Sequence, residues 1–198
     1  NGTAEDFTIG GTGAVNANGG FTLGSNLGGD TLTLNRQLII GNAATSNWNR
    51  APSIATDVLI TGTGSIVNNG SIDAQNDNDR TITVAVPVTN NSSITKSAGT
   101  GNLIFSGAFE NTLGSFLTVS TDVVELNGGS GGDHEGTFDI TGFLDLRGGH
   151  TFGSSSNIIG TGAVSNFSGT SDFTVSLGFD STIGINGYGG ILELGGSE

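Results

Sequence analysis

Hydrophobic and polar residues alternate in short bursts along most of the chain. The longest burst, 81–88, places Ile82, Val84, Val86 and Val88 at every second position. A period of two predicts β-strands, with one face buried and the other facing outward. Comparable bursts of three to five residues occur at 7–9, 21–23, 31–34, 58–60, 102–105, 116–119, 123–126, 137–140, 143–146, 173–175, 182–185 and 191–194.

The shortness and even spread of these strands favour a parallel β-solenoid over a β-sandwich. A sandwich requires longer strands, of about 5–6 residues, around one two-sided core. In a solenoid each coil contributes two or three short strands, which pair with the coils above and below. We therefore predict a single all-β domain over 1–198, built as a rod-shaped parallel β-helix. At roughly 20 residues per coil it would have about ten coils, with strands ~4.8 Å apart.

The tripeptide Gly-Thr-Gly marks where the chain turns between strands. It occurs at 11–13, 62–64, 99–101 and 160–162, each time before a short alternating segment. Glycine is favoured at corners because it adopts positive φ without steric cost. The intervals between the four copies are unequal, so we expect the length of a coil to vary.

Residues 93–129 contain a series of short motifs. The series begins with Thr-Lys-Ser-Ala-Gly-Thr-Gly at 95–101 and continues through a Ser-Gly and an Asn-Thr turn to Glu-Leu-Asn-Gly-Gly at 125–129. This order resembles the passenger-associated repeat of bacterial autotransporters. Residues 64–72 are similar in style to adhesins of the filamentous-haemagglutinin type. The resemblance implies a right-handed parallel β-helix in an exported surface protein. It implies no catalytic residue, because that repeat has none.

One stretch, 42–56, departs from the alternating pattern. It contains the only Trp of the chain, Trp48, together with Arg50 and Pro52. We interpret it as a loop that protrudes from the rod. Trp48 and Arg50 are candidate ligand-binding residues there, since an indole and a guanidinium can stack on a sugar ring. The alternative is that Trp48 packs against the core.

Composition excludes several classes of protein. Gly alone accounts for 36 residues, good helix formers are scarce and Cys is absent, which excludes helical bundles, disulfide scaffolds and thiolate metal sites. A net charge of -13 argues against nucleic acid as a partner. No apolar run approaches the ~20 residues of a membrane-spanning helix. Met is also absent, so we expect a processed or excised chain from a secreted, extracellular protein of the cell surface.

Acidic residues gather in the second half of the chain. Four strands carry an acid at their third position, where alternation directs it outward, and these acids could form a ladder: Glu125, Asp139, Asp145 and Glu193. Glycoside-cleaving β-helices need paired carboxylates, and the candidate pairs are Asp139 with Asp145, or Asp77 with Asp79 beside Arg80. With only five Lys and Arg residues, the chain is poorly supplied for acidic sugars. We therefore assign no catalytic residue and expect no enzyme.

Two acidic segments are candidates for weak calcium binding. Asp73, Asp77 and Asp79 are closely spaced, and hard cations prefer several carboxylate and amide oxygens. Asp133 ends a glycine-rich segment, 128–133, that matches the start of a calcium-binding nonapeptide repeat but has no second copy. Solvated acidic turns are the alternative at both places, and no other cofactor is expected. His134 follows Asp133 in this turn, where we expect it to be exposed.

These observations predict an extracellular, non-catalytic β-solenoid. Strand patterning extends close to both ends without an amphipathic capping helix. Unpaired strand edges at the ends of a solenoid invite pairing with another chain. The predicted partner is a second copy, stacked end to end in a surface filament, or a cell-surface or glycan ligand if the chain is a segment of an adhesin. The alternative is a carbohydrate-binding or carbohydrate-active β-helix.

Overall fold

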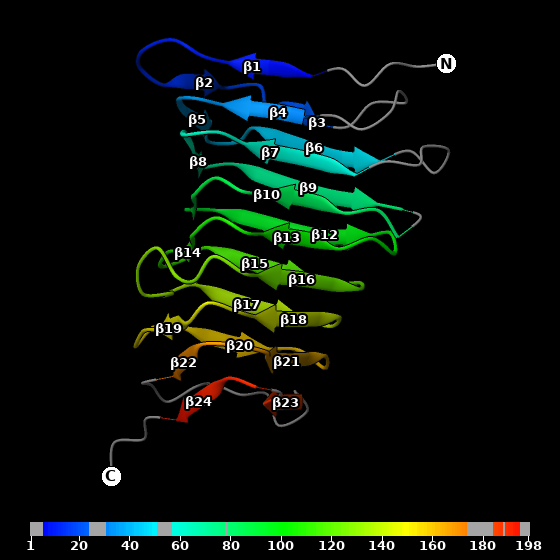
Figure 1. The fold of residues 1–198 in the computed structure, drawn as a ribbon, viewed down its shortest axis with the longest axis vertical. Helices are drawn as coiled ribbons and strands as arrows, with labels where there is room; N and C mark the ends of the chain where they lie inside the picture. Colours follow the sequence, from blue (N-terminus) through cyan, green and yellow to red (C-terminus); the bar gives the residue numbers. More distant parts are fainter. Residues whose placement is uncertain are drawn as a thin grey trace.

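The described part of the chain folds into a stack of short parallel strands that runs from β1 to β24 (Figure 1). This computed structural model describes residues 6–23, 31–50, 57–77, 79–173, 184–187 and 189–194. Every pairing between the described strands is parallel, and no helix occurs in these ranges. The predicted all-β parallel solenoid is thereby confirmed.

The strands form three long sheets and one short sheet, here named A to D. Sheet A contains β1 (Phe7–Ile9), β4 (Thr31–Leu34), β7 (Val58–Thr61), β10 (Ile82–Val84), β13 (Leu103–Phe105), β16 (Val123–Leu126), β18 (Phe143–Leu146), β21 (Ala163–Asn166) and β23 (Gly184–Gly187). Sheet B contains β2 (Val15–Ala17), β5 (Gln37–Ile40), β8 (Ser65–Asn68), β11 (Val88–Asn90) and β14 (Phe109–Asn111). Sheet C contains β3 (Thr22–Leu23), β6 (Thr45–Arg50), β9 (Ser71–Asn76), β12 (Ser93–Ala98), β15 (Phe116–Val119), β17 (Thr137–Ile140) and β20 (Asn157–Ile159). Sheet D contains β19 (His150–Phe152), β22 (Thr170–Phe173) and β24 (Ile191–Leu194).

The solenoid has about 7 turns, fewer than the ten predicted. Turns near the N-terminus take up more of the chain than we assumed, since Leu32 of β4 pairs with Ile60 of β7. A turn in the second half is shorter and matches the assumption, since Phe105 of β13 pairs with Leu126 of β16. We therefore predicted too many turns because the turns near the N-terminus contain more residues than the assumed number.

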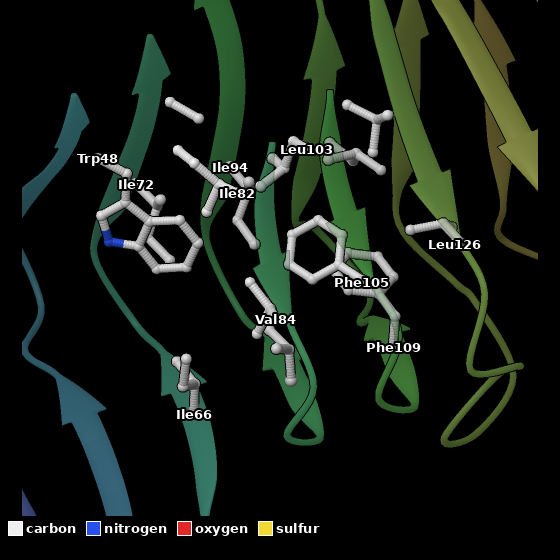
Figure 2. Close-up of a cluster of buried hydrophobic side chains, with 14 of the residues drawn as sticks. Trp48, Ile66, Ile72, Ile82, Val84, Ile94, Leu103, Phe105, Phe109 and Leu126 are labelled. Carbon is white, nitrogen blue, oxygen red and sulfur yellow. The ribbon is translucent and has the colours of Figure 1, made fainter. Parts of the chain in front are cut away.

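The core is a continuous column of the inward-facing residues of successive turns (Figure 2). Neighbours in register, such as Ile82 and Leu103, lie directly above one another and are at most 1% exposed. Farther along the column the rings of Phe105 and Phe109 lie with their centroids 4.7 Å apart. Burial of each such side chain stabilises the fold by about 1.5–3 kcal/mol relative to exposure.

The predicted loop at 42–56 is wrong for residues 45–50, which form strand β6 in sheet C. Ser46 and Trp48 are both 0% exposed, and Trp48 pairs in register with Ala74 of β9, whose small side chain leaves room for the indole. The polar Ser46 at an inward position had hidden the alternation. Residues 51–56 lie outside the described residues.

The Gly-Thr-Gly tripeptides form corners where successive turns stack closely. Gly62 has a φ of 119°, and a Cβ added there would overlap the carbonyl oxygen of Leu34 in the preceding turn. Gly160 repeats this arrangement, with a φ of 113° above the carbonyl oxygen of Ile140. These corners require glycine both for its conformation and for its lack of a side chain.

A ladder of buried asparagines lines the interior corner after sheet B. The Asn68 Nδ2 donates to Asn90 Oδ1 at 2.8 Å, and the Asn90 Nδ2 donates to Asn111 Oδ1 at 2.8 Å. Each Nδ2 also donates to a main-chain oxygen at the start of a strand of sheet C in the following turn, at 2.9–3.0 Å; the acceptors are Ser93, Phe116 and Thr137. The three amides are 0% exposed, and this ladder ties four successive turns together.

Candidate functional site

Two carboxylates lie side by side on the outer face of sheet A. Glu125 is the third residue of β16 and Asp145 is the third residue of β18, and the two are partners in register. The residues that flank them along each strand, such as Val124 and Leu126, are 0% exposed, so alternation turns both acids outward. We refer to Glu125 and Asp145 as the carboxylate pair.

Amide groups and one arginine surround Glu125. Its Oε1 accepts a hydrogen bond from the Asn102 Nδ2 at 2.9 Å, and its Oε2 accepts one from the Asn127 Nδ2 at 3.2 Å. An Arg147 guanidinium nitrogen lies 3.8 Å from Oε2, while the guanidinium carbon lies 4.9 Å from the centroid of the Phe167 ring. Glu125 is thus fixed in place by three neighbours, and its side chain is 12% exposed.

Burial raises the pKa of the Asp145 carboxyl to about 6, and the negative charge of Glu125 adds to this effect. Arg147 acts in the opposite direction and does not cancel it. A proton therefore resides on Asp145 for part of the time near neutral pH, while both oxygens of Glu125 accept hydrogen bonds. Two neighbouring carboxyls, one of them with a raised pKa, are the kind of groups used in general acid–base catalysis.

The four acids predicted to share one ladder are distributed over three sheets. Asp139 belongs to β17 in sheet C, where it pairs in register with Thr118 and Ile159. Glu193 belongs to β24 in sheet D, where it pairs with Asp172. Of the four, only Glu125 and Asp145 share a ladder, because the alternating pattern fixes the face of a strand and leaves its sheet open. Asp139 and Asp145 are therefore not the facing pair considered from the sequence.

The candidate calcium ligands are not brought together into one group. Asp73 accepts hydrogen bonds from Gln75 and Ser97 on the outer face of sheet C, whereas the Asp79 main-chain nitrogen donates to Thr100 Oγ1 at 3.2 Å. Among the residues described, no three or more His, Asp or Glu side chains lie close enough to hold a metal ion. Asp133 is exposed in a different turn.

The structure places Trp48 where it does not reach a ligand from outside. Its indole is 0% exposed and lies in the core at a ring-centroid distance of 6.1 Å from Phe21. The main chain of Arg50 pairs with Asn76 in β9, and the Arg50 side chain lies outside the described residues. Of the two interpretations of Trp48, packing against the core is confirmed.

A buried lysine escaped the sequence analysis. Lys96 of β12 is 0% exposed, and its Nζ donates to the carbonyl oxygens of Ala98 and, at 3.0 Å, Gly99. Burial lowers its pKa, and the charges of Asp122, Asp77 and Asp73 partly oppose this. The signal was present in the sequence, because Lys96 stands two residues after Ile94, at the next inward position of the strand.

The two histidines were also missed as buried groups. His134 is 0% exposed and His150 is 1% exposed, so the predicted exposure of His134 is wrong. The His134 Nε2 lies 3.0 Å from the His150 Nδ1. The glycine-rich segment around His134 carries no alternation that could have indicated an inward position. The His134 main-chain nitrogen donates to Thr151 O at 2.8 Å, and this bond orients His134 with its side chain inward, like an inward residue of a strand.

Comparisons with known proteins give no relative for this chain. No protein-family model matches it, and neither a curated protein nor a solved structure does. The resemblance of residues 93–129 to autotransporter repeats thus stays a prediction. Within the part of the chain that the structure describes, no helix has the length and apolar character to cross a membrane.

Proposed function

We propose that this chain is an extracellular structural β-solenoid without catalytic activity, wound in the right-handed sense that its resemblance to autotransporter repeats implies. In this proposal it serves as a subunit of an end-to-end stacked surface filament, or as a segment of a bacterial adhesin. The observation that carries the proposal is the open strand edge at each end of the described stack. Such edges are templates for pairing with another chain.

Among the described residues, the first turn has main-chain groups that pair with no further strand. The Ile9 carbonyl oxygen accepts a hydrogen bond from the Asn35 nitrogen at 3.0 Å, so this residue of β1 faces β4. Because successive residues of a strand face opposite edges, the N–H and C=O of Thr8 point away from β4. No strand lies beyond β1 among the described residues. Most apolar residues of this turn, such as Phe21, are only partly buried, although Leu23 is 2% exposed.

A single arginine holds this first turn in shape. The Arg36 Nε donates to Gly13 O at 2.6 Å, and its two terminal nitrogens donate to Gly10 O at 3.0 Å and Ala14 O at 3.1 Å. Five fixed donors on a planar group suit arginine for such a role. The edge of β1 is therefore ordered before any partner arrives, which lowers the entropic cost of pairing.

The opposite end offers a matching edge. The Gly184 nitrogen donates to Gly162 O at 3.0 Å, so Gly184 faces β21 and the neighbouring Ile185 faces away from it. Ile191, at the start of β24, is 60% exposed. A second copy could continue the parallel ladder at either end.

Sedimentation velocity over a range of concentrations and electron microscopy test the filament version. We expect rods that lengthen with concentration. Thr8→Pro removes the outward N–H of β1 and should reduce assembly, whereas Thr8→Val keeps that N–H and should assemble normally. A wild-type chain that stays monomeric at high concentration overturns the filament and leaves the adhesin segment.

The carboxylate pair favours one alternative, a carbohydrate-active β-helix. Strands in neighbouring turns are spaced about 4.8 Å apart, close to the ~5–5.5 Å that separates the carboxyls of retaining glycosidases. This alternative predicts reducing-end release from neutral polysaccharides by the wild-type chain. Asp145→Asn and Glu125→Gln should each abolish it, and Asp139→Asn on sheet C should not. Equal activity in all four proteins, or none in any, excludes this function.

A further inference from the structure

The two histidines form a chain of hydrogen bonds with a fixed direction. The Asn111 main-chain N–H donates to His134 Nδ1 at 3.3 Å, so that Nδ1 carries no proton in the neutral ring. His134 Nε2 then carries the proton and donates to His150 Nδ1 at 3.0 Å. In turn, His150 Nε2 donates to the carbonyl oxygens of Leu126 and Arg147, both at 3.0 Å. All four ring nitrogens are used when both rings are neutral.

The rings lie in an aromatic environment inside the solenoid. The centroid of the His134 ring is 6.0 Å from that of Phe109, 5.3 Å from that of Phe138 and 5.0 Å from that of Phe152. The two imidazoles stack at 5.3 Å with an interplanar angle of 18°. Phenylalanine rings offer no hydrogen-bond acceptor and compensate only weakly, through their faces, for a positive charge buried without water.

No carboxylate faces either imidazole among the described residues. The charged residues of the surrounding strands and turns are partly or fully exposed, and they are Glu110, Glu125, Asp133, Glu135, Asp139, Asp145, Arg147 and Asp172. Glu135, the nearest in sequence to His134, accepts a hydrogen bond from the Ser155 nitrogen at 2.7 Å. Burial lowers the pKa of His134 to about 3, with a contribution from His150. Burial also lowers the pKa of His150, against the opposing effect of its hydrogen bonds to Leu126 and Arg147.

Protonation of either ring breaks the chain of hydrogen bonds at a defined place. A proton added to His134 Nδ1 would point at the Asn111 N–H, and a proton added to His150 Nδ1 would point at the His134 Nε2–H. We propose that His134 and His150 form an acid-sensitive latch that joins successive turns at neutral pH and releases them when a proton binds. The latch connects β14, β16 and β19, and it does not depend on the proposed filament function.

Imidazole nitrogen NMR tests the protonation state directly. The chain has two histidines, so a ¹⁵N–¹H long-range spectrum contains two ring systems. We expect both rings in the Nε2–H neutral form from pH 7 to pH 5 in the folded protein. A ring that titrates near the ordinary value of about 6.5 in the folded state overturns the proposal.

Hydrogen exchange tests the release of the turns. Protection factors for peptides within 126–152 should fall roughly tenfold or more between pH 7 and pH 5 relative to peptides within 82–105, which contain no histidine. The double variant His134→Gln/His150→Gln keeps a donor and an acceptor at each position and should remove this difference. The double variant retains Asp145, which loses its charge over the same pH range, so it also controls for that group. Equal protection at both pH values in the wild type overturns the latch, and the NMR test applies even where the variant does not fold.

Discussion

Two stretches of the interior contain buried polar side chains that hydrogen-bond from one turn to the next, and they use different residues to do so. In the turns of β8, β11 and β14 the corner is filled by Asn68, Asn90 and Asn111, joined through amide hydrogen bonds. In the following turns His134 and His150 continue the chain of hydrogen bonds, starting from the Asn111 main chain. Both stretches give hydrogen-bond partners to the polar side chains they bury, and both connect one turn to the next.

The difference lies in what each stretch does when conditions change. Amides do not titrate, so the asparagine ladder holds its hydrogen bonds at any moderate pH. Imidazoles gain protons in weak acid once they are free of the core. The asparagines also repeat at the same position of successive turns, whereas the histidines are accompanied by stacked phenylalanines such as Phe152 and Phe173, with centroids 4.3 Å apart. The C-terminal stretch therefore relies more on ring packing and on pH.

The largest effect should come from Phe152→Ala, which removes a ring that contacts His134, Phe138 and Phe173. We expect a loss of about 4 kcal/mol in the free energy of unfolding, measured by urea denaturation, because the cavity cannot collapse fully. Phe143→Ala, at a side chain that is 53% exposed, serves as the control and should cost under ~1 kcal/mol. Equal losses in the two variants would contradict the importance of the ring stack.

A smaller effect, about 3 kcal/mol, is expected for Asn90→Ala. The substitution removes three buried hydrogen bonds, those of Asn90 with the Asn68 Nδ2, the Asn111 Oδ1 and the Phe116 carbonyl oxygen. The Asn68 Nδ2 keeps its bond to Ser93 O, and the Asn111 Oδ1 keeps its bond from Ser115 Oγ. Asn91→Ala changes an exposed amide one residue along and should cost less than about 1 kcal/mol. Urea unfolding at pH 7 and pH 5 should show the same difference between the two variants, since no titratable group is involved. If the difference in stability between the two variants changed with pH, the asparagine ladder would not differ from the histidines in its response to pH.

The contribution of His134 to the pH dependence of stability should be smaller than the effect of Asn90→Ala. The folded pKa of His134, at about 3, lies below the ordinary value of 6.5, so the unfolded chain binds more protons as the pH falls. The contribution of His134 to stability is therefore complete above about pH 7 and is lost between pH 7 and pH 3. Linkage gives a loss of about 2 kcal/mol from His134 alone between pH 7 and pH 5. Thermal or urea unfolding of His134→Gln should lack this slope.

The smallest effect concerns the outer face and has the opposite sign. Because the pKa of Asp145 is raised to about 6 by burial and by Glu125, its charge destabilises the folded chain at pH 7. Asp145→Asn should raise the free energy of unfolding by about 1 kcal/mol at pH 7, after allowance for solvent screening. The gain should disappear at pH 4, where the wild-type carboxyl is protonated in the fold. A gain that persists at pH 4 would point to a cause other than charge.

Much of this architecture follows from local patterns, and the tertiary partnerships do not. The alternation of Ile82, Val84, Val86 and Val88 gives inward positions that are all at most 2% exposed. The same alternation also places Lys96 and Trp48 at inward positions. We did not recognise it there because polar residues, Lys96 itself and Ser46 beside Trp48, occupy inward positions. The carboxylate pair could not be identified, because the unequal lengths of the turns decide which acids meet. The histidine pair depends on a turn without strand pattern.

The direction of the hydrogen bonds has a mechanical consequence. In this solenoid the bonds between turns run along the axis of the stack, so tension applied at the two ends pulls them directly apart instead of shearing them. Each turn that peels away exchanges a rise of ~4.8 Å for an extended chain of roughly 20 residues, about 70 Å long. A rod of this kind would lengthen in discrete steps under load, and the turns tied by Asn68, Asn90 and Asn111 should be among the last to yield.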